Sequence, residues 1–255
     1  MIDFGNKTAL VTGGSRGIGA ATVKAMCDAD ANVIIHYGSN REAAEKTANE
    51  CGKDRCHIIG SDLSEPGAAT GLWREAVKWK GQVDILVNNA GVFVSTEIDC
   101  ADDVWRDAWQ RTMQINLFAT ADLCREAISH WQSSDRGGAI VNVASRAAFQ
   151  GDAPDVWAYA ASKGGMISLT KTLARAYSKQ GVYTYAVAPG FTETEMATDA
   201  FDDDPALRPR VISEIPMGDI VPPAEIANCI CFLASGLATH ALGQTIDVNG
   251  ASYVR

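Results

Sequence analysis

A tyrosine and a lysine four positions apart, Tyr159 and Lys163, have the spacing that most clearly suggests chemistry in this chain. Residues i and i+4 share one face of a helix, and the segment from Asp155 to Gln180 has helical spacing. A phenol with an ordinary pKa of about 10 is a weak base near neutrality, and a nearby ammonium group favours the phenolate. The pair is therefore predicted to donate or accept a proton, with Lys163 lowering the pKa of Tyr159. Ser145 stands upstream at a predicted strand end, which argues against an accidental pair.

A second candidate site is the glycine-rich turn between a strand-like run, Thr8–Thr12, and a helical run that begins at Ile18. Gly13, Gly17 and Gly19 give the turn the spacing GxxxGxG. Glycine supplies positive φ angles and lets the backbone approach a ligand, and a helix N-terminus offers free N–H groups to an anion. The turn is therefore predicted to bind the pyrophosphate of a dinucleotide. The residues between these glycines belong to the same predicted site: Ser15, Arg16 and Ile18.

The end of the second predicted strand, Asn32–Tyr37, distinguishes two cofactors. An NAD site usually carries an acidic residue there to hold the ribose 2′-hydroxyl, but this chain has Tyr37 and no acid until Glu42. Arginine binds phosphate in a bidentate manner, which suits the 2′-phosphate of NADP. NADP(H) is therefore favoured over NAD(H), although Arg41 could instead only begin an exposed helix. The predicted contacts at this end of the cofactor are Arg16, Tyr37, Ser39, Asn40 and Arg41.

Strand-like and helix-like segments alternate along the whole chain, which predicts one doubly wound α/β domain over residues 1–255. The mostly parallel sheet should have about seven strands, with helices on both faces in a Rossmann-type arrangement. The predicted strands are Thr8–Thr12, Asn32–Tyr37, Arg55–Gly60, Val83–Asn88, Ala139–Ala144, Val182–Ala188 and Gln244–Val248, and the predicted helices are Ile18–Asp30, Glu42–Cys51, Glu65–Lys80, Asp102–Trp131, Asp155–Gln180 and Pro223–Ser235.

The stretch Thr192–Arg210 is acidic and lacks a clear periodicity, with three consecutive aspartates at Asp202, Asp203 and Asp204. Such a composition is typical of a mobile segment rather than a core element. It follows the sixth strand, so it should lie at the edge of the sheet where ligands bind. We expect a mobile lid at about residues 192–217.

Composition limits the classes of partner. The 255 residues carry 22 basic and 31 acidic side chains, a net charge of −9, which argues against nucleic acid or an anionic membrane as a partner. The N-terminus does not resemble a signal peptide and no apolar run is long enough to span a membrane, so a cytoplasmic location is expected. No metal site is predicted, and free buried thiols are expected at Cys27, Cys51, Cys56, Cys100, Cys124, Cys229 and Cys231.

Several motifs in order resemble those of the classical short-chain dehydrogenase/reductase family, and the resemblance covers nearly the whole chain. The motifs are the glycine turn, the NNAG run Asn88–Gly91, Asn116 in the long helix, Ser145 after the fifth strand, the YxxxK pair Tyr159 and Lys163, and the PG turn Pro189–Gly190 with Thr194 after it. The resemblance implies an oxidoreductase that transfers hydride between a nicotinamide cofactor and a carbonyl/alcohol pair.

The resemblance also implies roles for individual residues. Tyr159 would exchange a proton with the substrate oxygen, Ser145 would hold that oxygen, and Lys163 would tune Tyr159 and contact the nicotinamide ribose. Asn116 would orient a water that connects Lys163 to solvent. Further cofactor contacts implied by position are Asp62, Leu63, Asn89, Ala90, Gly91, Pro189, Gly190, Phe191 and Thr194.

Two residues depart from the family pattern. Tyr185 stands where the family often has an asparagine, and we expect it to be structural. Arg146 follows Ser145 where small residues are frequent, and it could contact substrate or support a subunit interface. Predicted substrate contacts, which suit a small or medium hydrophobic carbonyl compound, are Phe93, Arg146, Phe149 and Trp157.

Alternatives to this function stay open at the level of sequence. Many similar chains are 3-oxoacyl-acyl-carrier-protein reductases, which need basic residues near the site for their acidic partner. Arg136 and Arg175 are available for that role, but Gln180 stands where another basic residue is expected. A non-catalytic NADP(H)-binding regulator on the same fold is a further alternative. The family resemblance also implies a homotetramer.

Overall fold

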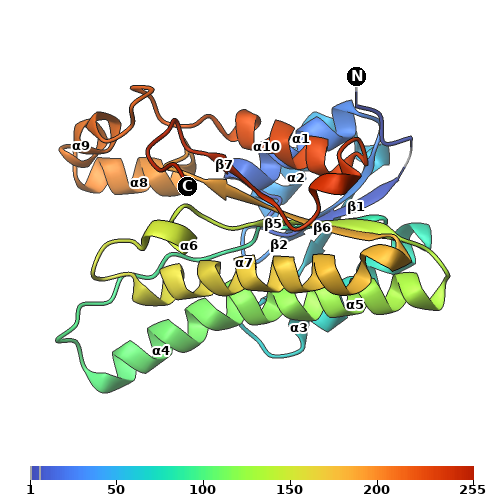
Figure 1. The fold of residues 1–255 in the computed structure, drawn as a ribbon, viewed down its shortest axis with the longest axis horizontal. Coiled ribbons are helices and arrows are strands. Elements are labelled where there is room, and N and C mark those ends of the chain that lie inside the picture. Colours follow the sequence, from blue (N-terminus) through green and yellow to red (C-terminus); the bar gives the residue numbers. More distant parts are fainter. Residues whose placement is uncertain (1, 6) are drawn as a thin grey trace.

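The computed structural model describes residues 2–5 and 7–255. In this part of the chain, seven parallel strands form one sheet in the order β3-β2-β1-β4-β5-β6-β7 (Figure 1). The strands are β1 (Thr8–Val11), β2 (Asn32–Tyr37), β3 (Cys56–Gly60), β4 (Ile85–Asn88), β5 (Gly138–Val143), β6 (Val182–Pro189) and β7 (Thr245–Val248). The predicted doubly wound parallel sheet is therefore confirmed, and its strand order reverses direction between β1 and β4.

Helices cover both faces of this sheet. Residues of α1 (Gly17–Asp28), α2 (Arg41–Cys51) and α10 (Pro223–Ala234) form one hydrophobic core with the sheet. Residues of α3 (Ala68–Lys80), α5 (Ala119–Ser133) and α7 (Trp157–Tyr177) form a second core against the opposite face (Figure 1). The central strands are buried on both sides, which explains why their sequences are apolar without alternation.

The long helical stretch predicted from Asp102 to Trp131 is helical throughout, but it is not uniform. It consists of α4 (Asp102–Met113), a π-helical turn at Gln114–Phe118, and α5. Such turns arise where one extra residue enters a helix, and they often occur at functional sites. The turn contains Asn116, so the irregularity lies at a predicted site residue.

The structure corrects the expectation of an irregular segment at 192–210. This stretch contains two helices, α8 (Glu195–Asp203) and α9 (Leu207–Ser213), and a short α6 (Ala147–Gln150) also went unpredicted. Four buried side chains, Phe201, Val211, Ile215 and Ile220, give the segment a small hydrophobic core of its own. The apolar positions of this segment are few and far apart among acidic residues. Their helical spacing was therefore not recognised in the sequence.

Helices α8 and α9 extend from one end of the molecule, on the side opposite α7 (Figure 1). A single parallel bridge between Thr192 and Val221 joins the two ends of this excursion beside β6. The segment is therefore anchored at its base and packed mainly against itself. None of the described helices is both long and apolar enough to cross a membrane.

Candidate active site

The glycine turn after β1 has the geometry of an anion cradle. Gly13 and Gly17 have φ angles of 61° and 53°, a region that favours glycine. A Cβ atom at Gly19 would overlap the carbonyl oxygen of Gly13, so only glycine allows this close approach. Helix α1 begins at Gly17 with no side-chain cap at Arg16, which leaves its first N–H groups available for a phosphate. These features fit the pyrophosphate of a dinucleotide.

Two side chains connect this turn to β4 across the point where the strand order reverses. The Asn89 amide donates hydrogen bonds to the carbonyl oxygens of Thr12 (2.9 Å) and Gly13 (3.1 Å). The Thr12 hydroxyl accepts bonds from the backbone N–H groups of Asn89 (2.9 Å) and Ala90 (3.0 Å). Asn89 and Ala90 are predicted as cofactor contacts, and in this structure they hold the turn in place.

His36 is a site residue that sequence reasoning missed. It is buried at the end of β2, where its Nδ1 accepts the Gly13 N–H (3.1 Å) and its Nε2 lies 2.9 Å from the Ser61 carbonyl oxygen. These partners require a neutral ring protonated at Nε2. Burial lowers the pKa of His36, against a smaller opposing effect of the Ser61 carbonyl. The only sequence signal was a polar residue inside an otherwise apolar strand.

The residues predicted to hold the adenosine end gather after β2 and β3, and several already have partners. Tyr37 packs its ring over the Cα of Gly60. The Asn40 side chain caps α2 by accepting the Ala43 N–H (3.0 Å). Arg41 begins α2 and pairs with Glu45 (2.8 Å) on its exposed surface, a position compatible with either a helix start or a phosphate contact.

Neighbouring predicted contacts differ in exposure. Ser39 is exposed, whereas Leu63 is buried. Asp62 is exposed and accepts two hydrogen bonds from Ser64, through its hydroxyl (2.7 Å) and its backbone N–H (2.9 Å). The hydroxyl bond, and then the backbone bond, lower the pKa of Asp62. Asp62 is therefore held as a carboxylate at the carboxyl end of β3.

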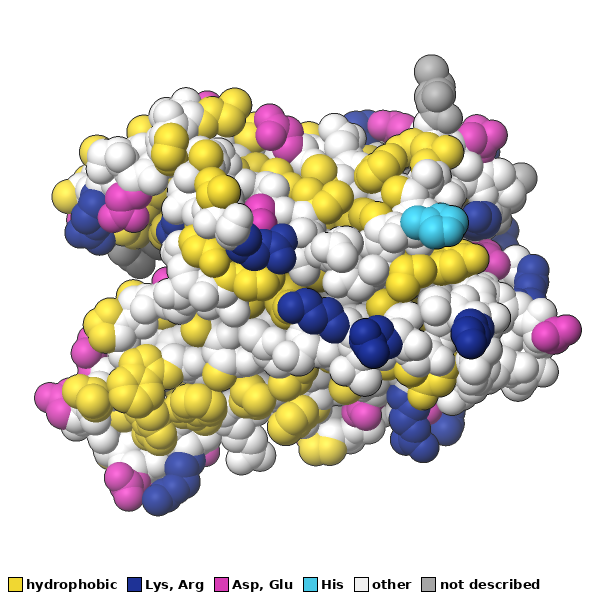
Figure 2. Space-filling model, viewed as in Figure 1, with side chains coloured by type: hydrophobic (Ala, Val, Ile, Leu, Met, Phe, Trp, Pro, Cys, Tyr) yellow, Lys and Arg dark blue, Asp and Glu magenta, His cyan; other side chains and the backbone are white. Residues whose placement is uncertain are grey.

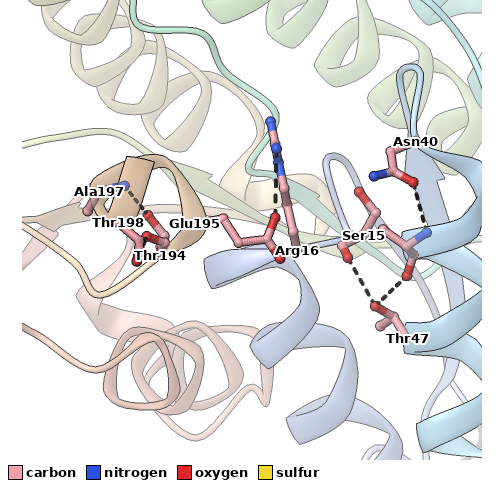
Figure 3. Close-up of polar contacts among 9 residues, drawn as sticks. Ser15, Arg16, Asn40, Thr47, Thr194, Glu195, Ala197 and Thr198 are labelled. Carbon is pink, nitrogen blue, oxygen red and sulfur yellow. Dashed lines mark hydrogen bonds and ion pairs between the residues drawn. The ribbon is translucent and has the colours of Figure 1, made fainter. Parts of the chain in front are cut away.

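Arg16 of the glycine turn faces the beginning of α8 (Figure 3). Its guanidinium group lies 3.7 Å from the Glu195 carboxylate, and both side chains are more than half exposed. A Cβ at Gly17 would meet the Thr194 methyl group at 3.0 Å, so the segment before α8 contacts the turn directly. On the other side of the turn, the Ser15 carbonyl oxygen accepts the Thr47 hydroxyl (3.2 Å) from α2. The turn is thus held between α2 and the segment that leads into α8.

Ser145 follows β5 and Tyr159 lies near the start of α7, at the same edge of the sheet. Ser145 is 8% exposed and its hydroxyl oxygen accepts the Ala147 N–H (3.1 Å), which fixes its position. Lys163 is 4% exposed, and its ammonium group donates to the Val143 carbonyl oxygen (2.8 Å). The same ammonium group lies 5.7 Å from the centre of the Tyr159 ring.

Asn116 completes this group from the π-helical turn. It is fully buried, with its side chain accepting the Val92 N–H (2.8 Å) and donating to the Val92 carbonyl oxygen (3.0 Å) and the Ser162 hydroxyl (3.1 Å). A Cβ at Gly91 would lie 3.3 Å from the Asn116 amide oxygen and 3.5 Å from the Lys163 ammonium nitrogen. Glycine at position 91 therefore leaves room for both the Asn116 amide and the Lys163 ammonium group beside the loop after β4.

The pair predicts a lowered Tyr159 pKa, but in this structure the net pKa of Tyr159 is raised. Burial raises the pKa of Tyr159, and a hydrogen bond with Ser145 opposes the rise only in part. Burial also lowers the pKa of Lys163 to about 8. Both groups are drawn toward their neutral forms because each loses water, and the Lys163 charge is directed to the Val143 carbonyl oxygen rather than to the phenol.

The four predicted substrate contacts do not lie together but have different neighbours in the structure. The Phe93 ring packs edge-on against Tyr159 with centroids 4.9 Å apart. The Arg146 guanidinium lies over the Phe191 ring, 5.2 Å from its centre. Phe149 stacks on Tyr253, with Arg255 over its ring, so the C-terminal residues flank it. Trp157 points to Trp105 on α4 instead.

The Pro189–Gly190 turn at the end of β6 borders the same site. A Cβ at Gly190 would lie 2.7 Å from the Cβ of Asn249, so the turn packs closely against the residue after β7. Pro189 is buried, and its carbonyl oxygen accepts the Arg146 N–H (3.1 Å). Tyr185, within β6, is fully buried in the core, with its hydroxyl donating to the Ala238 carbonyl oxygen (3.4 Å).

Comparisons with known proteins identify the family to which the chain is similar. Residues 13–251 match the family model described as enoyl-(acyl carrier protein) reductase. A 3-oxoacyl-acyl-carrier-protein reductase of Staphylococcus epidermidis is 34% identical over 98% of this chain and 100% of its own length. A 3β-hydroxysteroid dehydrogenase of Eggerthella lenta is 35% identical over 97% of this chain and 94% of its own length.

A solved structure is similar in the same way. A provisionally assigned 2-deoxy-D-gluconate 3-dehydrogenase from Agrobacterium tumefaciens, crystallised with bound NADP, superposes with a TM-score of 0.88 at 30% sequence identity. The superposition covers 99% of this chain and 98% of that protein. The names of these three relatives refer to chemically different substrates, an acyl thioester, a steroid and a sugar acid.

Proposed function

The chain belongs to the classical short-chain dehydrogenase/reductase family of NAD(P)-dependent oxidoreductases, and from this premise we propose that it transfers hydride between NADP(H) and a carbonyl/alcohol pair on a small or medium-sized substrate. The observation that carries the proposal is the convergence of Ser145, Tyr159, Lys163 and Asn116 at the carboxyl edge of the sheet, the edge at which the glycine turn also lies. When bound, the cofactor supplies or accepts the hydride; the protein contributes orientation and proton transfer.

Tyr159 and Ser145 act on the substrate oxygen. In reduction, the Tyr159 phenol gives its proton to the oxygen, and in oxidation the phenolate takes the hydroxyl proton. The Ser145 hydroxyl, fixed by the Ala147 N–H, donates a hydrogen bond to the same oxygen and stabilises its developing negative charge. The Phe93 ring packs against Tyr159 and covers this position on one side.

Lys163 and Asn116 support that proton transfer. The Lys163 ammonium group, anchored on the Val143 carbonyl oxygen, places a positive charge near the phenol and within reach of a nicotinamide ribose. Asn116 holds the loop after β4 through Val92 and lies beside Gly91 and Lys163. It is thereby placed to orient a water molecule that carries protons from Lys163 to solvent.

NADP(H) is favoured over NAD(H) by the residues around the adenosine end. Arg16 and Arg41 are exposed on the two sides of the turn, and β2 ends in Tyr37 without an acidic residue. Their present partners, Glu195 and Glu45, are exposed carboxylates whose ion pairs contribute little energy. A cofactor 2′-phosphate could replace them on the arginines, because a dianion binds a guanidinium group more strongly. The structural relative bound to NADP supports this preference.

Helices α8 and α9 form the proposed lid, residues 192–217, of a single domain that spans the chain. Figure 2 shows the molecule hollowed between these helices and the beginning of α7. The segment packs on its own small core and is joined to the sheet by the Thr192–Val221 bridge. Movement about that bridge would open or cover the site without disturbing the main cores.

Reduction of 3-oxoacyl-acyl-carrier protein is the second candidate, favoured by the similarity to reductases of that substrate. The predicted docking residues do not support it. Tyr159 and Arg175 are sixteen residues apart on α7, so about 24 Å of helix separates them. Arg136 precedes β5, whereas Ser145 follows it, so Arg136 also lies at the opposite edge of the sheet. The Arg136 side chain is hydrogen-bonded to Gln82 there.

We also propose a homotetramer. Exposed hydrophobic side chains gather over α4 and the beginning of α7, at the lower left of Figure 2. Val104 on α4 and Trp157 at the first position of α7 are 52% and 47% exposed. Contiguous apolar surface of this kind is typical of a subunit interface. Light scattering that gives the mass of one chain would contradict the proposal.

The function is tested by following NADPH absorbance with a panel of ketones, keto sugars, quinones and 3-oxoacyl thioesters. Three proteins are compared: wild type, Tyr159→Phe, and Tyr177→Phe as a matched control at the far end of α7. We expect one substrate class to be reduced by wild type and control, with turnover about 10²–10⁴-fold lower in Tyr159→Phe. Equal turnover in all three proteins would overturn the assignment of Tyr159. Preference for thioesters would select the second candidate.

A further inference from the structure

Three of the seven cysteines meet at a place that the proposed function does not use. Cys27 is at the end of α1, Cys51 is the last residue of α2, and Cys56 is the first residue of β3. Their sulfur atoms all lie within 4.8 Å of one another. The predicted free thiols are confirmed, but Cys27 is buried while Cys51 and Cys56 are only half-buried. The meeting point is at the edge of the sheet opposite the site of Tyr159.

The distances between the sulfur atoms are close to those of a metal site. Thiolates that share one ion at about 2.3 Å stand roughly 3.8–4.0 Å apart, in tetrahedral or trigonal geometry. The sulfur atoms of Cys27 and Cys56 are 3.6 Å apart. The other pairs, at no more than 4.8 Å, would need to approach by about 1 Å at most.

The surroundings are held together and accessible. Arg55 bonds Asp30 through the carboxylate (2.7 Å) and the backbone carbonyl oxygen (3.0 Å), which joins the loop after α1 to the residue before Cys56. The half-exposed Cys51 and Cys56 provide a path of entry from solvent, while Cys27 closes the inner side against the hydrophobic core. Such a preformed cup of ligands with an entry path is what a metal site requires.

The charge at this cluster can be counted from the three sulfur ligands and a nearby lysine. A thiolate is the form of cysteine that binds metal. Three thiolates around a divalent ion leave a single negative charge, and the cation near Cys51 is Lys24 on α1, which also pairs with Asp28 (3.6 Å).

We propose that Cys27, Cys51 and Cys56 form a three-thiolate site for a thiophilic d10 metal ion of the zinc class. Among the described residues, no histidine or carboxylate joins this group, so the fourth position is open to water. Binding exchanges thiol protons for the ion: each remaining S–H proton is released to solvent as its metal–sulfur bond forms. The ion would join α1, α2 and β3, the elements that carry the adenosine end of the proposed cofactor site.

The main alternative is a redox pair, in which two of the thiols form a disulfide. A disulfide would use two sulfur atoms and leave the third without a role, whereas one ion uses all three. The half-buried Cys100 and Cys229 lie outside this group and provide matched controls. The two readings are separated by testing reduced protein with a metal probe.

The test is a titration of reduced, chelator-treated full-length protein with Cd²⁺, following thiolate-to-cadmium absorbance in the ultraviolet and proton release. Wild type, Cys100→Ser and Cys229→Ser are expected to bind one ion per chain with equal affinity. Cys51→Ser and Cys56→Ser should bind at least about tenfold more weakly. Saturating Zn²⁺ should displace Cd²⁺ and raise the melting temperature of wild type but not of Cys51→Ser. Circular dichroism confirms that each variant is folded.

Three results would overturn the proposal. One is the absence of saturable binding at one ion per chain. Another is that Cys229→Ser and Cys51→Ser weaken Cd²⁺ binding equally, which would mean that the metal binds to scattered surface thiols and not to one site. The third is reduced protein that binds no Cd²⁺ yet forms a disulfide within the group in air, which would replace the metal site by a redox pair. The readouts do not depend on NADPH turnover, so they stand apart from the test of the proposed function.

Discussion

At the scale of single residues, burial raises the pKa of Tyr159 and lowers the pKa of Lys163. Both shifts favour the neutral form of the side chain. The phenol therefore stays protonated through neutral pH, which suits reduction, where it gives up a proton. Alcohol oxidation needs the phenolate and should become faster as pH rises. This asymmetry of the two directions follows from burial rather than from the spacing of the YxxxK pair.

Replacing Lys163 tests this relation. In Lys163→Met, kcat/KM should fall about 100-fold or more in both directions, and oxidation should require a higher pH, because the positive charge near the phenol is lost. The measurement is the pH profile of kcat/KM for wild type and variant. Lys171→Met, an exposed change on the same helix, is the control. An unchanged pH profile in Lys163→Met would separate Lys163 from the ionisation of Tyr159.

His36 predicts a pH dependence of stability. Its pKa is lowered below the ordinary value of 6.5 by burial, so its contribution is complete above that pH and is lost as pH falls toward the folded-state pKa. The free energy of unfolding in urea should be measured for wild type and for His36→Asn as a function of pH. Below pH 6.5 the difference between the two should shrink, by roughly 1 kcal/mol for each unit by which the His36 pKa is lowered. A difference that is constant with pH would show that His36 does not titrate in this way.

At the scale of elements, the glycine turn and α3 make opposite predictions for the same substitution. Gly19→Ala would place a methyl group on the Gly13 carbonyl oxygen, so cofactor binding should be lost, as measured by NADPH fluorescence titration. Gly71→Ala lies inside α3 with open space around the added Cβ, and should stabilise the protein by about 0.5–1 kcal/mol. NADPH binding by Gly19→Ala with wild-type affinity would refute the close packing of the turn.

The contact between Arg16 and Glu195 joins the proposed lid to the turn and predicts an effect on cofactor preference. If the 2′-phosphate replaces the carboxylate, Glu195→Gln should lower the KM for NADPH by up to about fivefold, because an exposed pair is worth at most about 1 kcal/mol. The KM for NADH should change little. Glu193→Gln, which removes the partner of Arg208, is the matched control. An equal change for NADPH and NADH would exclude a role at the 2′-phosphate.

The sequence was most informative where spacing is local. Strand β2 and the turn from Gly13 to Gly19 were predicted closely, because apolar runs and glycine positions reflect backbone needs. The lid helices were missed, since their few apolar residues, such as Phe201 and Val211, bury one another only after the segment folds. The partners of His36 and the meeting of the three cysteines depend on contacts between distant elements, which spacing does not encode.

At the scale of the whole molecule, the two edges of the sheet have separate roles. The carboxyl edge carries the glycine turn, the tyrosine–lysine pair and the lid, as expected at a reversal of strand order. The amino edge carries the three cysteines, together with Arg136 and the far end of α7. Substitutions at the cysteines should therefore change metal binding and stability without changing turnover.

The central claim is hydride transfer from NADPH to a substrate carbon with the proton supplied by Tyr159. The most direct measurement uses NADPH carrying deuterium at both C4 hydrogens and analyses the product by mass spectrometry. The account predicts one deuterium atom in each product molecule, bound to the former carbonyl carbon. Product formation should be strongly reduced in Tyr159→Phe and normal in Tyr177→Phe. Product without deuterium at that carbon would contradict hydride transfer from this cofactor, whichever substrate is used.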